Sequence, residues 1–278
     1  MLVSTETLAA HLNDPDWVVF DCRHDLKDFA RGGVVYAAGH VPGAFFAAVE
    51  TDLSGPKTGR NGRHPLPDPA KFAAFLSARG VTDSSRIVAY DDMGNQYAAR
   101  LWWMTRWIGL RGAAVLDGGW PKWVAEKRPE THLVPPLRHG HVAAKVDAGM
   151  VVRTDEVVKN LGGSGLVVVD ARAAERFRGE TEPIDPVAGR IPGARNRFFK
   201  SNLRDDQTFR PAAELRGDFE DLLGGTPLNR VAHQCGSGVT GCVNLLAMEL
   251  AGLSGSKLYA GSWSEWIADP ARPVARGA

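Results

Sequence analysis

The sequence predicts an α/β protein of two tandem domains, each a mostly parallel sheet flanked by helices. Its 278 residues are enough for about two domains of ordinary size. Short apolar runs alternate with helical patterns, which is typical of a parallel sheet covered by helices. Blocks of sequence also recur in the same order about 145 residues apart, a period as long as a whole domain. We therefore expect two copies of one fold.

The recurring blocks indicate where the two copies lie. Residues 18–23 (VVFDCR) recur as 167–172 (VVVDAR), and residues 39–44 (GHVPGA) recur as 189–194 (GRIPGA). Between the copies, Pro135-Pro136 stands in a stretch without clear periodicity, which favours a linker. We expect an N-terminal domain at 1–130, a linker at 131–147 and a C-terminal domain at 148–278.

Each copy contains three predicted strands and four predicted helices. Apolar runs predict strands at 17–21, 86–91 and 113–116, and again at 166–170, 230–234 and 257–259. Helical spacing predicts helices at 5–12, 68–79, 95–108 and 120–126, and again at 154–161, 212–223, 240–250 and 262–268. Loops rich in Gly and Pro are expected at 51–67 and 180–190, and loops at the carboxyl ends of such strands commonly carry function.

Composition excludes several classes of function. Thirty-three basic and thirty-two acidic residues leave a net charge of +1, which disfavours nucleic acid or an anionic membrane as partner. No apolar run approaches the ~20 residues that span a bilayer, and the N-terminus does not resemble a secretory signal. Three cysteines without a CxxC or HExxH motif argue against a disulfide framework and against a metal site. We expect a reduced, cytoplasmic protein.

The third repeated strand ends differently in the two copies. Alignment places Asp91 opposite Cys235, where the strand runs directly into Cys-Gly-Ser-Gly-Val-Thr (235–240). Gly236 and Gly238 would let successive backbone N–H groups point inward, and the following helix adds its positive end. Such a loop favours the thiolate, so we interpret Cys235 as a nucleophile rather than a small buried residue. This interpretation requires a sulfur that packing does not seal off and amides that face it.

The repeat and the loop resemble a known family. The tandem copies, the CGSGVT loop and the blocks at 117–120 (DGGW) and 261–266 (GSWSEW) are similar to the two-domain rhodanese-like sulfurtransferases over essentially the whole chain. In that family the N-terminal copy is inactive and commonly carries Asp at the cysteine position, as at Asp91. The CGSGVT form is associated with 3-mercaptopyruvate as donor, whereas thiosulfate enzymes usually place Arg-Lys after the cysteine. The resemblance implies a rhodanese-like fold for both copies.

The resemblance implies that sulfur is transferred through a persulfide on Cys235. The sulfur would come from 3-mercaptopyruvate, or alternatively from thiosulfate, and pass to a thiol, to cyanide or to a thioredoxin-like protein, with no cofactor and no metal. The Ser237 hydroxyl would polarise the keto oxygen or relay a proton. Five backbone amides would hold the persulfide anion, those of Gly236, Ser237, Gly238, Val239 and Thr240.

The substrate-binding arginines follow the family's pattern only in part. Mercaptopyruvate enzymes share an Arg-Phe pair and a second arginine within a Glu-Pro-Arg-Pro stretch. Arg176 precedes Phe177, but the second stretch reads Glu-Pro-Ile-Asp-Pro, with Ile184 in place of arginine. Arg178 and Arg190 are the candidates to replace it. A solvated helix face is the alternative role for Arg176.

Two histidines, His40 and His64, are candidates for a role in the reaction. His40 corresponds to a histidine thought to assist the serine in mercaptopyruvate members of the family. A His before Val-Pro-Gly is explained equally well as a turn-capping hydrogen bonder, and we favour that structural role. His64 precedes Pro-Leu-Pro in a loop that could reach across a domain interface, but a surface loop is the preferred interpretation.

The remaining cysteines and two charged pairs are expected to be structural. Cys242 follows Cys235 by two helical turns, so it could resolve the persulfide, but a packed core thiol is favoured. Cys22 is expected to be structural. The pairs Asp21/Arg23 and Asp170/Arg172 recur in both copies, including the copy without the nucleophile, and so predict ion pairs that support the fold.

A cysteine phosphatase and a non-catalytic persulfide carrier are the two alternative functions. A cysteine phosphatase would need Cys-x5-Arg to hold phosphate, but position 241 is Gly. A non-catalytic persulfide carrier would present the same residues as the enzyme, so the sequence leaves that alternative open.

Overall fold

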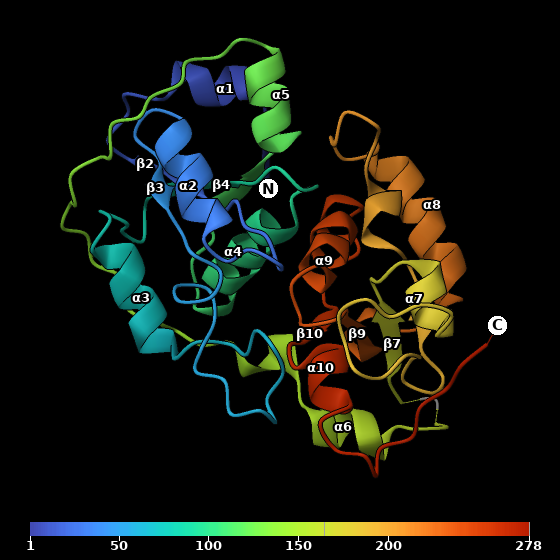
Figure 1. Cartoon of the computed structure of the whole chain (residues 1–278). Helices are drawn as coiled ribbons and strands as arrows, with labels where there is room; N and C mark the ends of the chain where they lie inside the picture. The colour runs from blue at the N-terminus through green and yellow to red at the C-terminus, as the bar shows by residue number, and fades with distance from the viewer. Residues whose placement is uncertain (164, 278) are drawn as a thin grey trace. The chain divides into compact units, whose positions relative to one another are not determined.

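Figure 1 shows the chain coloured from its N-terminus to its C-terminus. Each half of the chain folds around a five-stranded sheet in which every described strand pairing is parallel. The computed structural model describes residues 1–163 and 165–277. The first sheet has the order β1-β5-β4-β2-β3, made by Leu2–Val3, Ala113–Leu116, Arg86–Tyr90, Trp17–Asp21 and Phe45–Phe46. The second has the equivalent order β6-β10-β9-β7-β8, made by Val151–Val152, Lys257–Tyr259, Val231–Gln234, Val167–Asp170 and Arg195–Asn196. The predicted fold class is confirmed.

Helices follow the strands in both halves. The first half contains α1 (Thr5–Ala10), α2 (Arg31–Ala38), α3 (Pro69–Ser77), α4 (Gln96–Trp107) and α5 (Gly119–Ala125). The second contains α6 (Thr154–Lys159), α7 (Ala174–Arg178), α8 (Ala212–Leu223), α9 (Gly241–Leu250) and α10 (Ser262–Trp266). Three short 3-10 turns lie at Ala148–Met150, Phe199–Asn202 and Leu228–Arg230.

All predicted strands and helices form, within two residues of the expected bounds. The sequence missed the four two-residue strands β1, β3, β6 and β8, because so short a strand shows no periodicity of its own. It also missed α2, which contains two consecutive glycines and has no side-chain cap, and the five-residue α7.

The described chain folds into two compact units, and each unit contains segments from both halves of the sequence. The first unit contains Met1–Gly55, Leu66–Asp147 and Asp205–Phe209. The second contains Pro56–Pro65, Ala148–Arg204 and the chain from Arg210 onward. The segment expected as a linker has contacts within the first unit, where the Val142 N–H donates to Ser77 Oγ at 3.0 Å. No helix of the described residues is both long enough and apolar enough to cross a membrane.

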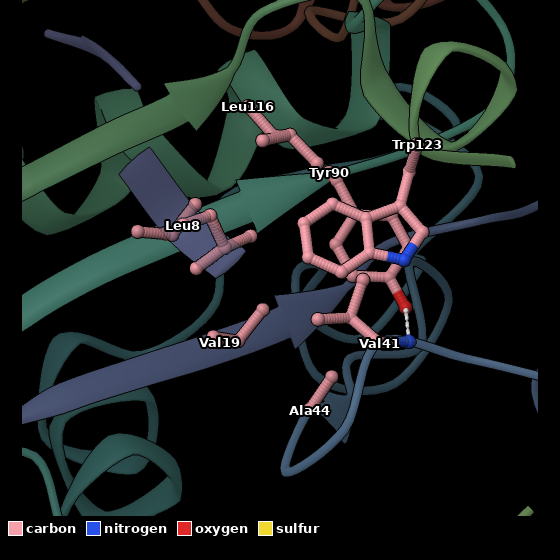
Figure 2. Close-up of a cluster of buried hydrophobic side chains, with 8 residues drawn as sticks. Leu8, Val19, Val41, Ala44, Tyr90, Leu116 and Trp123 are labelled. Carbon is pink, nitrogen blue, oxygen red and sulfur yellow. Dashed lines mark hydrogen bonds between the residues drawn. The ribbon is translucent and has the colours of Figure 1, made fainter. Parts of the chain in front are cut away.

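One face of the first sheet is covered by α1 and α5. Leu8 of α1 and Trp123 of α5 are fully buried against strand residues, among them Val19 and Tyr90 (Figure 2). The Tyr90 hydroxyl accepts a hydrogen bond from the Val41 backbone N–H at 3.2 Å, which satisfies a buried polar group in this core. Each large side chain buried here contributes about 1.5–3 kcal/mol relative to exposure.

The second unit repeats this arrangement with α6 and α10. Val157 of α6 packs with Trp263 and Trp266 of α10 against Val168 and Ala232 of the sheet. Trp266 takes the place of Trp123, as the repeat predicts. The duplicated sequence therefore builds the same core twice.

The predicted pairs Asp21/Arg23 and Asp170/Arg172 form buried ion pairs, each with an N–O distance of 2.6 Å. Each arginine also donates to a backbone carbonyl of the repeated Gly-His/Arg turn, Arg23 to Gly39 and Arg172 to Gly189. The pairs hold the strand end to that turn in both units. Their structural role is confirmed.

The fold places two loops at topological switch points. The connection from β7 leads to β8 at one edge of the second sheet, and the connection from β9 leads to β10 toward the opposite edge. The direction of the connections therefore reverses between the neighbouring strands β7 and β9, and the first sheet repeats this order. Ligands of open α/β sheets bind beside the carboxyl ends of strands at such a point. Cys235 directly follows β9, and Asp91 directly follows β4 at the equivalent point of the first sheet.

Candidate active site around Cys235

The Cys235 loop is anchored to the start of α10 by backbone hydrogen bonds. The Cys235 N–H donates to Ser262 Oγ at 3.1 Å, and the Cys235 carbonyl accepts from the Trp263 N–H at 3.0 Å. Ser262 adopts a left-handed conformation with φ of 55°, and its hydroxyl donates to the Tyr259 carbonyl. An unusual backbone conformation of a non-glycine residue at this contact is typical of functional sites.

Gly238 is required by space and by backbone conformation. It has φ of 77°, and a Cβ there would overlap the Ala260 carbonyl. A Cβ on Gly236 would lie 2.8 Å from Nη2 of Arg63, the end of a flexible side chain that can shift. Gly236 therefore marks where a guanidinium group lies next to the loop.

One loop amide faces the Cys235 sulfur. The Ser237 N–H points at Sγ with an N–S distance of 3.4 Å, which is the orientation expected for a group that stabilises a thiolate. Residue Cys235 is only 2% exposed, so its sulfur is more enclosed than we expect of a nucleophile. The structure therefore differs at this point from the accessible sulfur that the sequence interpretation requires.

His64 forms a pair with Ser237. His64 Nδ1 lies 2.8 Å from Ser237 Oγ, and both residues are less than 5% exposed. The interpretation of His64 as part of a surface loop is therefore wrong, because segment Pro56–Pro65 belongs to the second unit and turns this ring inward. The sequence does contain a signal for this role of His64. A catalytic hydroxyl needs a base nearby, and His64 lies in the Gly/Pro-rich loop at 51–67, where functional residues are common.

Arginine side chains converge beside Gly236. Arg176 Nη2 lies 3.7 Å from the position of a Gly236 Cβ, and Arg63 Nη2 is nearer still. Both guanidinium groups contact the Asp185 carboxylate, with Arg63 Nη1 on Oδ1 and Arg176 Nη2 at 3.3 Å from Oδ2. Arg176 also pairs with Glu182 at 2.6 Å. Sequence reasoning selected Arg176 and missed Arg63, which lies 113 positions earlier in the chain.

The two carboxylates of this cluster have pKa values shifted in opposite directions. Burial raises the pKa of Asp185, although Arg63 opposes that shift. Burial acts in the same sense on Glu182, but hydrogen bonds from Arg176 and from backbone N–H groups outweigh it and lower the pKa of Glu182. The guanidinium groups of Arg63 and Arg176 are donors that can bind an anion beside the loop.

The other predicted residues lie in different surroundings. Arg178 pairs with exposed Glu180 at 2.6 Å. The Arg190 guanidinium donates to the Gly277 carbonyl at 2.5 Å and lies 4.7 Å from the centre of the Phe177 ring. His40, in the first unit, is fully buried, with Nδ1 2.8 Å from the Tyr36 carbonyl and its ring stacked on Tyr36. These contacts agree with a structural role for His40.

The other thiols are buried, and the last two residues of the loop differ in exposure. Val239 is buried, and Thr240 stands at the first position before α9. The Cys242 thiol donates to the Gly238 carbonyl at 3.5 Å. In the first unit, burial raises the pKa of Cys22 well above its usual value, which makes that thiol a poor nucleophile.

The equivalent loop of the first unit holds an anion of its own. The Asp91 carboxylate accepts four backbone N–H groups at 2.8–3.0 Å, those of Met93, Asn95, Tyr97 and Ala98. Burial raises the pKa of Asp91 to about 6, while these N–H groups act in the opposite sense. The repeated loop therefore accommodates a negative group at the position that Cys235 has in the second unit.

A family comparison agrees with this duplicated geometry. The pattern of the rhodanese-like domain matches the chain twice, over residues 4–126 and 153–269. The chain belongs to the rhodanese family. Its second rhodanese domain contains the Cys235 loop, and its first contains the Asp91 loop.

Relatives of this rhodanese chain cover nearly all of its length. A probable 3-mercaptopyruvate sulfurtransferase of Pseudomonas aeruginosa is 48% identical over 278 residues, 99% of this chain and 98% of the relative. A putative thiosulfate sulfurtransferase of Mycobacterium tuberculosis is 38% identical over 279 residues, 100% of this chain and 97% of the relative. Among solved structures, a 3-mercaptopyruvate sulfurtransferase from Leishmania major has a TM-score of 0.86 and 31% identity, covering 98% of this chain and 75% of that one.

Proposed function

We propose that this protein transfers the sulfur atom of 3-mercaptopyruvate to a thiol or cyanide acceptor through a persulfide on Cys235. The observation that carries this proposal is the Cys235 loop, in which Ser237 directs its amide at the sulfur and its hydroxyl at His64. Family membership makes the chain a sulfurtransferase. The choice of donor follows from the groups around the loop.

Arg63 and Arg176 are the groups that would bind the donor's carboxylate. Both lie beside Gly236, the residue next to the nucleophile. Arg63 Nε is buried and has no hydrogen-bond partner among the described residues, so it is a further donor for an anion. Charge-assisted hydrogen bonds from two guanidinium groups would fix the carboxylate end of a small keto acid. Arg63 would thus supply the second arginine that the stretch at 182–186 lacks.

In the first half-reaction the Cys235 thiolate would attack the sulfur of 3-mercaptopyruvate. A sulfur–sulfur bond forms, the carbon–sulfur bond of the donor breaks, and its electron pair leaves as the enolate of pyruvate. The proton of the donor thiol ends on the methyl carbon of pyruvate, and the persulfide stays as an anion. Ser237 would donate to the enolate oxygen while His64 orients its hydroxyl, which places hydrogen bonding where charge develops.

Backbone amides would hold the persulfide anion. By correspondence with the Asp91 loop, the N–H groups of Ser237, Val239 and Gly241 would donate to the outer sulfur. Cys242 corresponds to Ala98, but its N–H already donates to the Val239 carbonyl at 3.0 Å. In the second half-reaction, cyanide or a thiolate would attack the outer sulfur and release the Cys235 thiolate, which gives ping-pong kinetics.

Mass spectrometry of the purified protein tests the proposal. After incubation with 3-mercaptopyruvate, we expect one added sulfur atom on the peptide that contains Cys235. The matched variants are Cys235→Ser, which should gain none, and Cys242→Ala, which should gain one. A native protein without the added sulfur, or a Cys235→Ser variant that still gains it, would refute the mechanism.

Parallel kinetics test the donor. We expect a higher kcat/KM with 3-mercaptopyruvate than with thiosulfate, and the reverse order would assign thiosulfate as donor. The three cysteines form no disulfide among the described residues, which fits the reducing cytoplasm that we propose as its compartment.

A further inference from the structure

Asp185 lies at the meeting point of the two arginines that face Gly236. Its carboxylate contacts Arg63 with one oxygen and Arg176 with the other. Arg176 also pairs with the buried Glu182, so two guanidinium charges meet two carboxylate charges and this group has no net charge. Glu182 in turn contacts Arg172, which pairs with Asp170.

The Asp185 charge acts at short range. Asp185 Oδ2 lies 3.7 Å from the position of a Gly236 Cβ, the same distance as Arg176 Nη2. The Asp185 side chain is 3% exposed, so water and salt screen its charge only weakly. Any anion bound by Arg63 and Arg176 would therefore interact with this carboxylate as well as with the guanidinium groups.

This acid stands in the stretch where the chain departs from the family pattern. Residues 182–186 read Glu-Pro-Ile-Asp-Pro, whereas the pattern has an arginine there. The change removes a positive charge from the stretch and brings a buried negative charge beside the loop. Each negative charge on a donor bound beside Gly236 is repelled by Asp185, so this change disfavours a donor with two charges more than a donor with one.

We propose that Asp185 is a specificity-determining residue that restricts this site to sulfur donors carrying a single negative charge. The inference rests on the proposed function, because it assumes that the donor's anionic end binds between Arg63 and Arg176. 3-Mercaptopyruvate has one carboxylate, which would accept hydrogen bonds from the two guanidinium groups. Thiosulfate is a dianion, and its second charge is repelled by Asp185 in surroundings of low dielectric constant.

The experiment compares kcat/KM for the two donors in the native protein and in Asp185→Asn. Asparagine keeps the size of the side chain and one oxygen acceptor but removes the charge. We expect the ratio of kcat/KM for thiosulfate to that for 3-mercaptopyruvate to rise about tenfold, equivalent to about 1.4 kcal/mol. The ratio cancels any shared loss from displaced arginines. Asp185→Glu, which keeps the charge, should leave the ratio within about threefold of the native value.

Asp155→Asn is the matched control. Asp155 is an exposed residue of α6 in the same unit, so its variant changes the net charge equally without touching the site. Its donor ratio should equal that of the native protein. A folded Asp185→Asn variant whose ratio is unchanged or lower, with both donors still reacting, overturns the inference and leaves the proposed function standing. If neither donor adds sulfur to Cys235 in the native protein, the proposed function itself fails.

A second measurement needs no variant and so does not depend on folding. Pyruvate and oxalate are planar acids of similar size that carry one and two negative charges at neutral pH. Measured by direct binding to the native protein without a sulfur donor present, pyruvate should bind more tightly than oxalate. Equal or tighter binding of oxalate contradicts the proposal, because it shows that the site accepts a second negative charge.

Discussion

His64 Nδ1 lies 2.8 Å from the hydroxyl oxygen of Ser237, two residues after Cys235 in the same loop. Both side chains are buried, so bulk water does not compete for this hydrogen bond. A histidine held this way can orient a serine hydroxyl and exchange a proton with it. The pair therefore gives the loop a proton-handling group next to the proposed nucleophile.

Replacing His64 with glutamine should affect the two donors differently. Loss of 3-mercaptopyruvate sulfur produces an enolate that needs a hydrogen bond and a proton, whereas loss of sulfite from thiosulfate needs neither. We expect His64→Gln to lower kcat/KM for 3-mercaptopyruvate about 100-fold, the usual size of a general acid–base contribution. The rate with thiosulfate should fall much less. Steady-state assays with both donors measure this difference.

The control for this variant is His139→Gln, at an exposed position of the first unit. It should leave both rates unchanged. Equal losses with the two donors in His64→Gln would show that the histidine only supports the loop, and would contradict its role in proton transfer.

The sequence identified the strand that leads to the nucleophile but missed part of its surroundings. Cys235 was found because a buried strand, two glycines and a helix start are consecutive in the chain, so local rules describe them. His64 and Arg63 reach the same loop from a segment more than 170 positions earlier. Local periodicity carries no information on such long-range pairing, and both residues stand in a loop rich in Gly and Pro.

The substrate-binding arginines show the same limit. An arginine is missing from the stretch at 182–186, and Arg178 and Arg190 are the replacements that the sequence predicts. In the folded chain Arg178 pairs with Glu180 and Arg190 with the Gly277 carbonyl, while Arg63 lies beside Gly236. Which cation fills a site depends on the path of the chain, and the residue type alone does not reveal it.

Removing the Arg63 charge should weaken donor binding. A charge-assisted hydrogen bond contributes about 1.5–3 kcal/mol, so Arg63→Gln should raise KM for 3-mercaptopyruvate roughly 10- to 100-fold with a smaller change in kcat. The matched control is Arg60→Gln, an exposed arginine of the same segment, which should leave KM unchanged. If KM is unaltered in Arg63→Gln, the donor's carboxylate does not bind to Arg63.

A methyl group at Gly238 should destabilise the second unit. Its φ of 77° is unfavourable for alanine, and the added Cβ would overlap the Ala260 carbonyl. Gly225 also has φ of 77°, but a Cβ there meets no other atom within 4 Å. We expect Gly225→Ala to cost about 1 kcal/mol and Gly238→Ala about 3 kcal/mol, because only the latter adds overpacking to backbone strain. Denaturant unfolding measures the free energy of unfolding of both variants. Equal losses would contradict the prediction, because they would show that the added Cβ at position 238 causes no overpacking.

His233 should make the protein sensitive to acid. Its ring is fully buried in β9, where Nε2 lies 3.0 Å from the Met248 sulfur, and burial lowers its pKa to about 3. The unfolded chain binds a proton near pH 6.5, so the unfolded state holds more protons than the folded state between pH 6.5 and about 3. Stability from this group is present above pH 6.5 and falls by about 2 kcal/mol on acidification to pH 5.

The variant His233→Leu tests this expectation. The decrease in its Tm between pH 7.5 and pH 5 should be smaller than in the native protein. The control His139→Leu, at an exposed site, should keep the native decrease. An identical decrease in His233→Leu would mean that the buried ring takes up a proton in the folded state.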